Sequence, residues 1–290
     1  HYPLRRQRQM CIRDSYITCS VSGSFYISSS TIPSYAGRNC KGTATIPQGV
    51  TGVLVAAFAP GTGSTPGDVN RDLTALVFPA SGFAQIDQGG FRNLGLTSLT
   101  IPASVIMVGL SAFENNPLTS VTVTGGSGGA STVLSQGAFS NQGFGLSTAI
   151  ALTLGSGKIE ISNNFGVKTT FSTVDFGAGL RSIDQQAFKS NGIAPGWVPF
   201  FPSTITSIAS EAFRYSPNLT TIRFGTETTT SITSINEWAF DKNYLKSIQY
   251  CGPRGDANAL SRYLRDFQQN AKIWCDFIAP NAPAITTSSQ

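Results

Sequence analysis

A phenylalanine with an aliphatic residue five positions before it recurs along most of this chain. Seven copies are regular: Val53 and Phe58, Ile86 and Phe91, Val108 and Phe113, Leu134 and Phe139, Ile183 and Phe188, Ile208 and Phe213, and Ile235 and Phe240. An eighth copy is centred on Phe165 and has Ile161 four positions before it. Successive phenylalanines are 22 to 33 residues apart. Such a period is typical of solenoid proteins, in which each repeat packs only on its neighbours.

A short segment with its own pattern follows each phenylalanine. It has a leucine-like residue, two small polar residues and an apolar, variable, apolar triplet, as in Leu96–Ile101. The other copies are Leu73–Phe78, Leu118–Val123, Ala149–Leu154, Phe171–Phe176, Leu219–Phe224 and Leu245–Tyr250, with a poorly formed one at Trp197–Phe201. The alternation predicts a short strand with one buried face. The Ala-Phe segment is too short for a stable isolated helix, so we predict one helical turn there.

These elements predict a right-handed solenoid of about eight coils, built mainly from short parallel strands and short helical turns. Because no repeat can bury its apolar residues alone, the phenylalanines are expected to stack in one column. We assign residues 44–250 to this solenoid, 16–43 to an N-terminal cap and 251–276 to a C-terminal cap. Caps are expected because an open end would expose unpaired strand edges.

The repeats resemble a known family. The segments LTSLTIPASVIMVGLSAFENNPLTSVTV and ITSIASEAFRYSPNLTTIRF are similar to the BspA-type leucine-rich repeats of bacterial and protist surface proteins. The resemblance covers about residues 44–250, with departures at Gly90-Phe91 and Asn164-Phe165, where Ala-Phe is expected. It implies a leucine-rich-repeat fold and a bacterial cell-surface protein that acts in adhesion or host interaction. Residues 277–290 are Pro-rich and polar, a composition that predicts a linker. Because bacterial members of this family often continue into further domains, the resemblance implies that the linker leads to a domain missing from this sequence.

Four of the five cysteines flank the repeats. Cys19 and Cys40 precede the first coil, and Cys251 and Cys275 follow the last one. Paired cysteines at both ends are typical of a secreted chain, so we predict disulfides within each pair, with free structural thiols as the alternative. Between the second pair, the apolar spacing over Ala257–Trp274 predicts a capping helix.

The net charge of +5 is concentrated at the front of the chain. Residues 1–15 hold four arginines and one aspartate, a charge of +3, which leaves +2 for the remaining 275 residues. This stretch lacks a signal-peptide pattern. It resembles a non-native leader from read-through, with a genuine basic arm as the alternative. A body of +2 lacks the basic stripe that nucleic-acid binding needs.

The composition excludes most catalytic chemistry. His1 is the only histidine, which excludes Ser-His-Asp and Cys-His catalysis and most zinc enzymes, and we predict no cofactor or metal. Gly125–Gly129 fits a hydrolase string, but without a later histidine it is interpreted as a flexible loop. Asp87, Asp184, Glu211 and Glu237 lie near the phenylalanines and are interpreted as solvated turn residues. No apolar run approaches the ~18 residues that cross a membrane, so we predict no membrane insertion.

The variable position of each triplet forms a candidate binding column. Its residues are Val77, Thr100, Thr122, Thr153, Asp175, Arg223 and Gln249. One interpretation is a solvated threonine ladder that keeps the sheet soluble, and the other is a recognition surface, since solenoid faces often bind partners. Tyr215, Tyr244, Arg214 and Trp238 would add contacts if exposed, although we expect Trp238 to pack in the core. The tripeptide Arg254-Gly255-Asp256 is interpreted as a chance match whose aspartate caps the helix.

We therefore expect a monomeric, non-catalytic module on the cell surface, in the cell wall or outside the cell. It would recognise an unidentified extracellular protein or glycan through the solenoid surface. The alternative is a structural spacer or surface-layer element that holds other domains away from the cell. The resemblance, more than the residues themselves, carries the functional part of this expectation.

Overall fold

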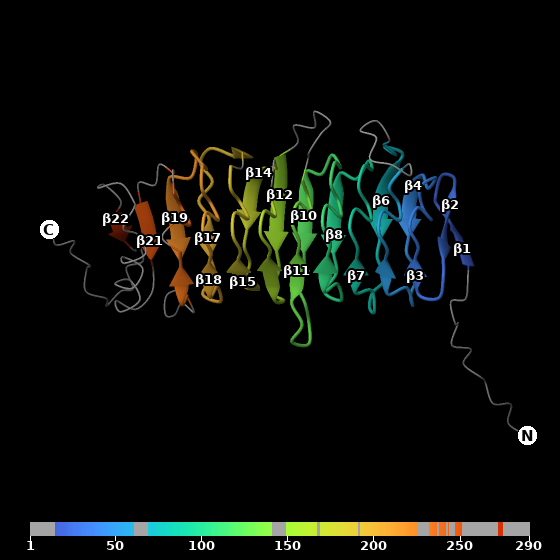
Figure 1. Cartoon of the computed structure of the whole chain (residues 1–290), viewed down its shortest axis with the longest axis horizontal. Helices are drawn as coiled ribbons and strands as arrows, with labels where there is room; N and C mark the ends of the chain where they lie inside the picture. The colour runs from blue at the N-terminus through green and yellow to red at the C-terminus, as the bar shows by residue number, and fades with distance from the viewer. Residues whose placement is uncertain are drawn as a thin grey trace, which may run out of the picture.

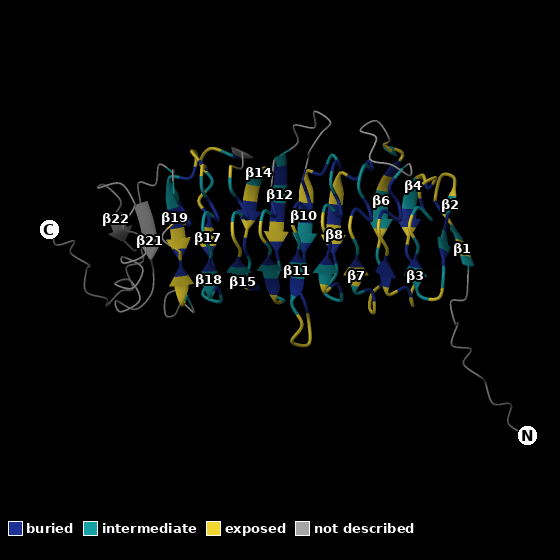
Figure 2. Cartoon of the chain, viewed as in Figure 1, coloured by how far each residue is buried: buried dark blue, intermediate teal, exposed yellow. Residues whose placement is uncertain are grey.

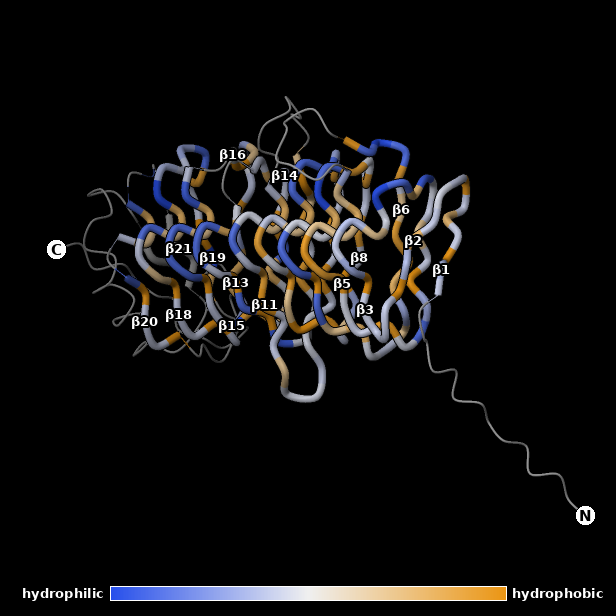
Figure 3. The backbone as a smooth tube through the Cα atoms, turned by 45° about the vertical axis from the view of Figure 1, so that its right-hand side comes forward, coloured by the Kyte–Doolittle hydropathy of each residue, from blue (hydrophilic) through white to orange (hydrophobic). Residues whose placement is uncertain are grey.

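The structure is a computed structural model that describes residues 15–60, 69–140, 149–166, 169–190, 192–224, 232–236, 238–241, 243, 247–250 and 272–274. At 192, 247–250 and 272–274 the description is of the backbone alone. The chain forms an elongated stack of coils whose first and last strands lie at opposite ends (Figure 1). Hydrophobic stretches recur at the same place in successive coils, seen as orange bands in Figure 3.

A nine-stranded parallel sheet runs the length of the stack and forms the lower row of strands in Figure 1. Its strands are β3 (Thr31–Ile32), β5 (Gly52–Val53), β7 (Gln85–Ile86), β9 (Met107–Val108), β11 (Thr132–Leu134), β13 (Ile159–Ile161), β15 (Leu180–Ile183), β18 (Ser207–Ile208) and β20 (Ser234–Ile235). The aliphatic residue of each repeat ends its strand. These residues pair in register from Val53 to Ile235, and all are buried.

A second set of strands forms three separate parallel sheets, which we call the split face. The first sheet contains β4 (Gly42–Thr45) and β6 (Leu73–Val77). The second contains β8 (Ser98–Ile101), β10 (Ser120–Val123), β12 (Ala149–Leu154), β14 (Thr170–Asp175) and β16 (Gly192–Ile193). The third contains β17 (Phe200–Phe201), β19 (Thr221–Phe224), β21 (Ser247–Tyr250) and β22 (Lys272–Trp274). The parallel strands predicted from the apolar triplets are therefore present.

The phenylalanines form the column expected from the repeat, and they are buried. Buried stretches recur in coil after coil along the stack (Figure 2). Neighbouring rings from Phe58 to Phe139 stack with centroids 5.0 to 5.6 Å apart. Phe165 meets both of its neighbours edge to face, at 5.8 and 5.6 Å. Its copy also has one residue fewer between the aliphatic residue and the ring. Stacking resumes from Phe188 to Phe240, at 5.1 and 5.2 Å.

The expected helical turns are wrong, since none of the described residues is helical. The segment around Phe113 shows the reason. Ser111 and Asn115, two positions either side, have φ values of 52° and 57°, outside the helical region. This conformation lets the backbone N–H of Phe113 donate to the carbonyl of Ala138 in the next coil, at 2.8 Å. The turns thus form a third hydrogen-bonded ladder along the stack.

Two further expectations need correction. The eight phenylalanines delimit about seven turns rather than eight coils. The predicted helix over Ala257–Trp274 is wrong at its end, because residues 272–274 form β22 and pair in parallel with β21. This pairing covers the strand edge that the last coil would leave open. The rest of that helix, residues 1–14 and the linker 277–290 lie outside the described residues.

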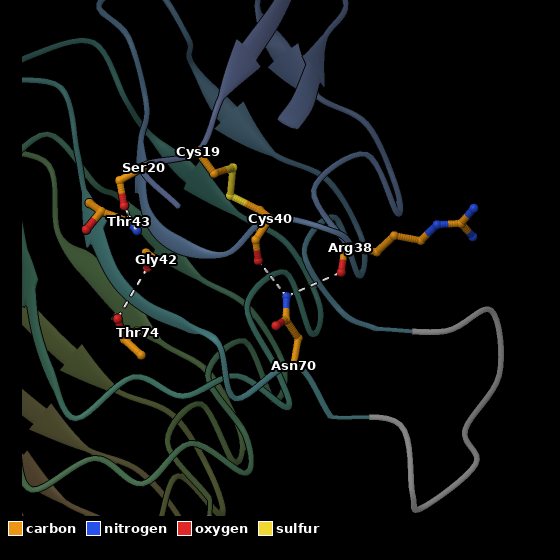
Figure 4. Close-up of a disulfide and its surroundings, with 8 residues drawn as sticks. All are labelled: Cys19, Ser20, Arg38, Cys40, Gly42, Thr43, Asn70 and Thr74. Atoms are coloured by element: carbon orange, nitrogen blue, oxygen red, sulfur yellow. Dashed lines mark hydrogen bonds between the residues drawn. A yellow bond between two sulfur atoms is a disulfide. The ribbon is translucent and has the colours of Figure 1, made fainter. Parts of the chain in front are cut away.

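The N-terminal end is closed by an antiparallel hairpin of β1 (Ser15–Thr18) and β2 (Ser24–Ile27). Phe25 of β2 covers the start of the phenylalanine column, 5.3 Å from Phe58. A disulfide joins Cys19 and Cys40, whose Cα atoms are 5.5 Å apart. The Asn70 side chain donates to the Cys40 carbonyl at 2.7 Å and so ties the bridge to the next coil (Figure 4). Cys251 and Cys275 lie outside the described residues.

Replacing one ring of the column tests its contribution to stability. Phe113→Ala removes stacking on both sides and leaves a cavity, so we expect it to lower the free energy of unfolding by about 3–5 kcal/mol. Phe200→Ala is the matched control, because Phe200 is 45% exposed, and should cost less than about 1 kcal/mol. Urea unfolding followed by circular dichroism measures both. If the two substitutions lowered the free energy of unfolding equally, the column would not stabilise the protein more than an exposed ring does.

Removing the disulfide tests the N-terminal closure. The bridge spans 21 residues of chain, and releasing a loop of this length should cost about 3 kcal/mol. The double variant Cys19→Ser, Cys40→Ser should unfold at lower temperature than the parent chain under non-reducing conditions, and a reductant should lower the midpoint of the parent by more than that of the variant. A parent midpoint that does not respond to reductant would show that the bridge adds nothing to stability.

Candidate functional site

The described residues hold no group of three His, Cys, Asp or Glu side chains that could bind a metal ion. Among them, no helix is long and apolar enough to span a membrane. The glycine-rich segment Gly125–Gly129 connects strand β10 to strand β11, so it is not the strand-to-helix elbow of a hydrolase. Gly126 pairs with Lys158 on the neighbouring coil, which holds this loop at its base.

The carboxylates considered for catalysis lie in separate turns. Asp87 accepts a hydrogen bond from Gln85, and Asp184 accepts one from the backbone of Gln185. Glu237 lies outside the described residues. No two of the described three face each other as a pair of acid and base would.

Glu211 instead belongs to a network that links three coils. Lys189 Nζ donates to its carboxylate at 2.6 Å and Gln186 Nε2 at 2.8 Å. Arg214 also pairs with it, and Arg214 Nε lies 2.9 Å from Asp241 Oδ2. The hydrogen bond from Lys189 lowers the pKa of the Glu211 carboxyl, with Gln186 and Arg214 adding to the effect and desolvation opposing it. A carboxyl held ionised in this way stabilises the stack and is poorly suited to donate a proton.

The predicted binding column lies on the split face. Thr100, Thr122, Thr153 and Asp175 pair in register on adjacent strands of one sheet. Three of them are exposed and Thr122 is half-buried. Further along, Arg223 is exposed and pairs with Gln249, of which the structure describes only the backbone. Val77 is separated from this group, because β6 and β8 belong to different sheets.

The structure adds Phe200, which the sequence reasoning missed. β17 pairs with β19 so that Phe200 lies opposite Arg223. The adjacent ring of Phe201 stacks between those of Phe176 and Phe224, at 5.2 and 4.8 Å. Phe200 therefore occupies the column position between Asp175 and Arg223, with 45% of its surface exposed. Aligning its dipeptide Phe-Phe with Asp175-Phe176 and Arg223-Phe224 would have revealed it.

The segment before Phe200 is fixed by Trp197. Its indole Nε1 donates to the Val174 carbonyl at 3.1 Å, while its ring packs 6.1 Å from that of Phe176. The Pro199 carbonyl accepts the backbone N–H of Arg223 at 2.9 Å. These contacts hold the segment before Phe200 in place. β14 and β17 belong to different sheets, and the stacking of Phe201 on Phe176 is what brings the two strands together. We call Asp175, Phe200 and Arg223 the charged-aromatic site.

A second outward row extends the surface with small residues. Ser98, Ser120, Ala151 and Thr173 pair in register on β8 to β14. Because these side chains are short, the middle of the split face offers hydroxyl groups without projecting side chains. It contrasts with the charged-aromatic site at its edge.

Other candidate contact residues lie on the turn ladder, away from the split face. Tyr215 is 47% exposed and stacks under the Arg214 guanidinium, 4.8 Å from the ring centroid. Trp238 is 46% exposed, contrary to the expected core packing. It lies two positions before Phe240, at the outward position that Glu211 holds in the preceding coil. Tyr244 and the tripeptide Arg254-Gly255-Asp256 lie outside the described residues.

Comparison with solved structures finds matches at low sequence identity. A leucine-rich repeat protein from Bacteroides ovatus is 17% identical, with 82% of this chain and 62% of that chain covered and a TM-score of 0.42. A leucine-rich cell surface protein from Faecalibacterium prausnitzii is 20% identical, with 75% and 62% covered and a TM-score of 0.36. The pneumococcal vaccine antigen PcpA is 14% identical, with 91% and 88% covered and a TM-score of 0.35. The chain thus spans less than two thirds of the first two.

A search of curated proteins finds no match to the sequence. A family model does match, namely that of the BspA type leucine rich repeat region, with 6 copies over residues 69–194 and 197–252. The match covers more than half of the chain and includes the strands of the split face from β6 to β21. The chain therefore belongs to the BspA-type leucine-rich repeat family.

Proposed function

We propose that this protein is a non-catalytic extracellular binding module that recognises a protein or glycan through the split face. The observation that carries the proposal is the charged-aromatic site. An exposed aromatic ring between an acidic and a basic residue combines an apolar anchor with charges that orient a partner. Phe200 lies on strand β17, whose backbone pairs with β19, so binding would order little of the protein backbone.

The surroundings of this site support a broad contact surface. Thr153 and Thr173 on the adjacent strands present hydroxyl groups, which donate and accept hydrogen bonds to either peptide or sugar. Solenoid faces are extended and shallow, which suits partners with large surfaces. The shallow surface and the absence of facing carboxylates among the described residues both favour binding over catalysis.

The proposed location outside the cell or on its surface draws on two observations. The Cys19–Cys40 disulfide is of a kind that persists in oxidising compartments and is rare in the cytosol. One of the similar structures is described as a cell surface protein. We further propose that the chain is monomeric, that the 44–250 solenoid carries the binding surface and that Cys251 and Cys275 close its C-terminal end.

Binding assays on variants of the charged-aromatic site test this function. The purified chain would be applied to arrays of extracellular-matrix proteins and glycans. Any partner found should bind Phe200→Ala and Arg223→Ala at least about tenfold more weakly, the effect expected from losing an anchor residue. Val55→Ala is the control, because Val55 is 48% exposed but lies in a turn after β5, and it should bind like the parent.

Two outcomes would contradict the proposal. Partners that bind the site variants and the parent equally would place recognition elsewhere on the protein. No binding above background on any array would instead favour a structural spacer or surface-layer element, in which the solenoid holds other domains away from the cell. Circular dichroism of each variant establishes that a loss of binding is not a loss of folding.

A further inference from the structure

The split face opens between β6 and β8, although these strands belong to consecutive coils. On the opposite side of the same coils, β7 pairs with both β5 and β9. A backbone hydrogen bond of 3.0 Å still joins Gly95 N–H to the Leu73 carbonyl at the start of the two strands. Beyond this point β6 and β8 belong to separate sheets. The two coils therefore diverge on one face only.

The edge of β8 that faces this opening has free backbone groups. The carbonyls of Thr97 and Ile101 accept hydrogen bonds from Thr119 and Thr124, on the β10 side. Because successive residues of a strand direct their N–H and C=O groups to opposite edges, those of Ser98 and Thr100 point toward β6. Both residues are exposed, and no ladder hydrogen bond joins β8 to β6. An edge of this kind is a template for another strand.

A hollow of about 370 Å³ lies between the two strands. Its lining residues are Ala75, Leu76, Val77, Phe78, Ser98, Leu99, Thr100 and Pro102. Leu76 and Phe78 are only partly buried there, so the hollow reaches the core. The Phe78 ring packs on Phe83 and Phe91, at 5.1 and 6.0 Å, which fixes the floor. The volume lies within the ~300–1,000 Å³ range of ligand pockets.

We infer that this hollow, the β6–β8 groove, binds an extended, uncharged peptide segment of a partner protein, which adds to the free edge of β8 as a strand. Main-chain hydrogen bonds to Ser98 and Thr100 would supply affinity, as in other cases of strand addition. The lining contains no charged residue, so a Lys or Glu of the peptide would lose water without gaining a partner. Apolar β-branched side chains complement Leu76 and Phe78. This inference does not rest on the charged-aromatic site.

A capped synthetic peptide with the sequence Thr-Ser-Val-Thr-Val-Thr, that of residues 119–124, is the probe. It copies the strand that already pairs with the other edge of β8. Fluorescence anisotropy of the labelled peptide with the full chain should show saturable binding with a Kd below ~1 mM. The same peptide N-methylated at its central four residues keeps its side chains but loses the backbone N–H donors of those residues. It should bind at least about tenfold more weakly.

Two variants at one position separate backbone pairing from side-chain contact. Thr100→Pro removes the N–H that faces the groove, at a strand edge where proline is tolerated, and should weaken peptide binding at least about tenfold. Thr100→Ser keeps the N–H and should bind like the parent, as should Phe200→Ala, which disables only the charged-aromatic site. If the charged-aromatic site bound nothing in the array experiment, the results expected here for the β6–β8 groove would not change.

Three results would overturn the inference. They are the absence of saturable binding at ~1 mM peptide, equal binding of the methylated and unmethylated peptides, and undiminished binding by Thr100→Pro. The comparison of the two peptides uses the parent chain alone. It therefore decides the matter even if Thr100→Pro fails to fold.

Discussion

Contact between the phenylalanine rings of neighbouring coils is the interaction on which the rest of the structure depends. No coil has enough apolar surface of its own to form a core, so each ring is buried mainly by its neighbours. The rings from Phe58 to Phe240 keep centroid distances of 5.0 to 5.8 Å, close to the spacing of strands in a sheet. The column thereby holds the strands and turns of adjacent coils within hydrogen-bonding distance, and this register arranges the split face.

Much of this architecture could be predicted from the sequence, because it depends on strong periodic signals. The phenylalanines and the apolar triplets recur too often to arise by chance, and the strand β12 has the bounds predicted for it. The strands of the nine-stranded sheet were missed, since a strand such as β9, with two residues, shows no alternation. The turns were predicted as helical because their non-glycine residues with positive φ, such as Ser111, are disfavoured locally. Bonds to the next coil stabilise them, and a local pattern does not contain those bonds.

The candidate site, like the fold, could be predicted from the sequence only in part. The column from Thr100 to Asp175 could be predicted, because strand alternation fixes which side chains point outward. Phe200 was missed because the irregular segment around Trp197 obscures the triplet pattern of its coil, although its dipeptide aligns with those of the neighbouring coils. The β6–β8 groove has no local signal at all. It arises because two coils stay paired through β5 and β7 while β6 and β8 diverge. This arrangement depends on contacts between coils, which a local sequence pattern does not contain.

Native-state hydrogen exchange tests most directly whether the column holds the coils together as one unit. The backbone amides of Phe91, Phe113, Phe188 and Phe213 all donate to the following coil. If the column couples the coils, these four amides should exchange through one shared opening with a common free energy. A single substitution such as Phe113→Ala should then lower that free energy at all four positions. Separate opening energies for the four amides, with the substitution felt at Phe113 and its immediate neighbours alone, would contradict the central role of the column.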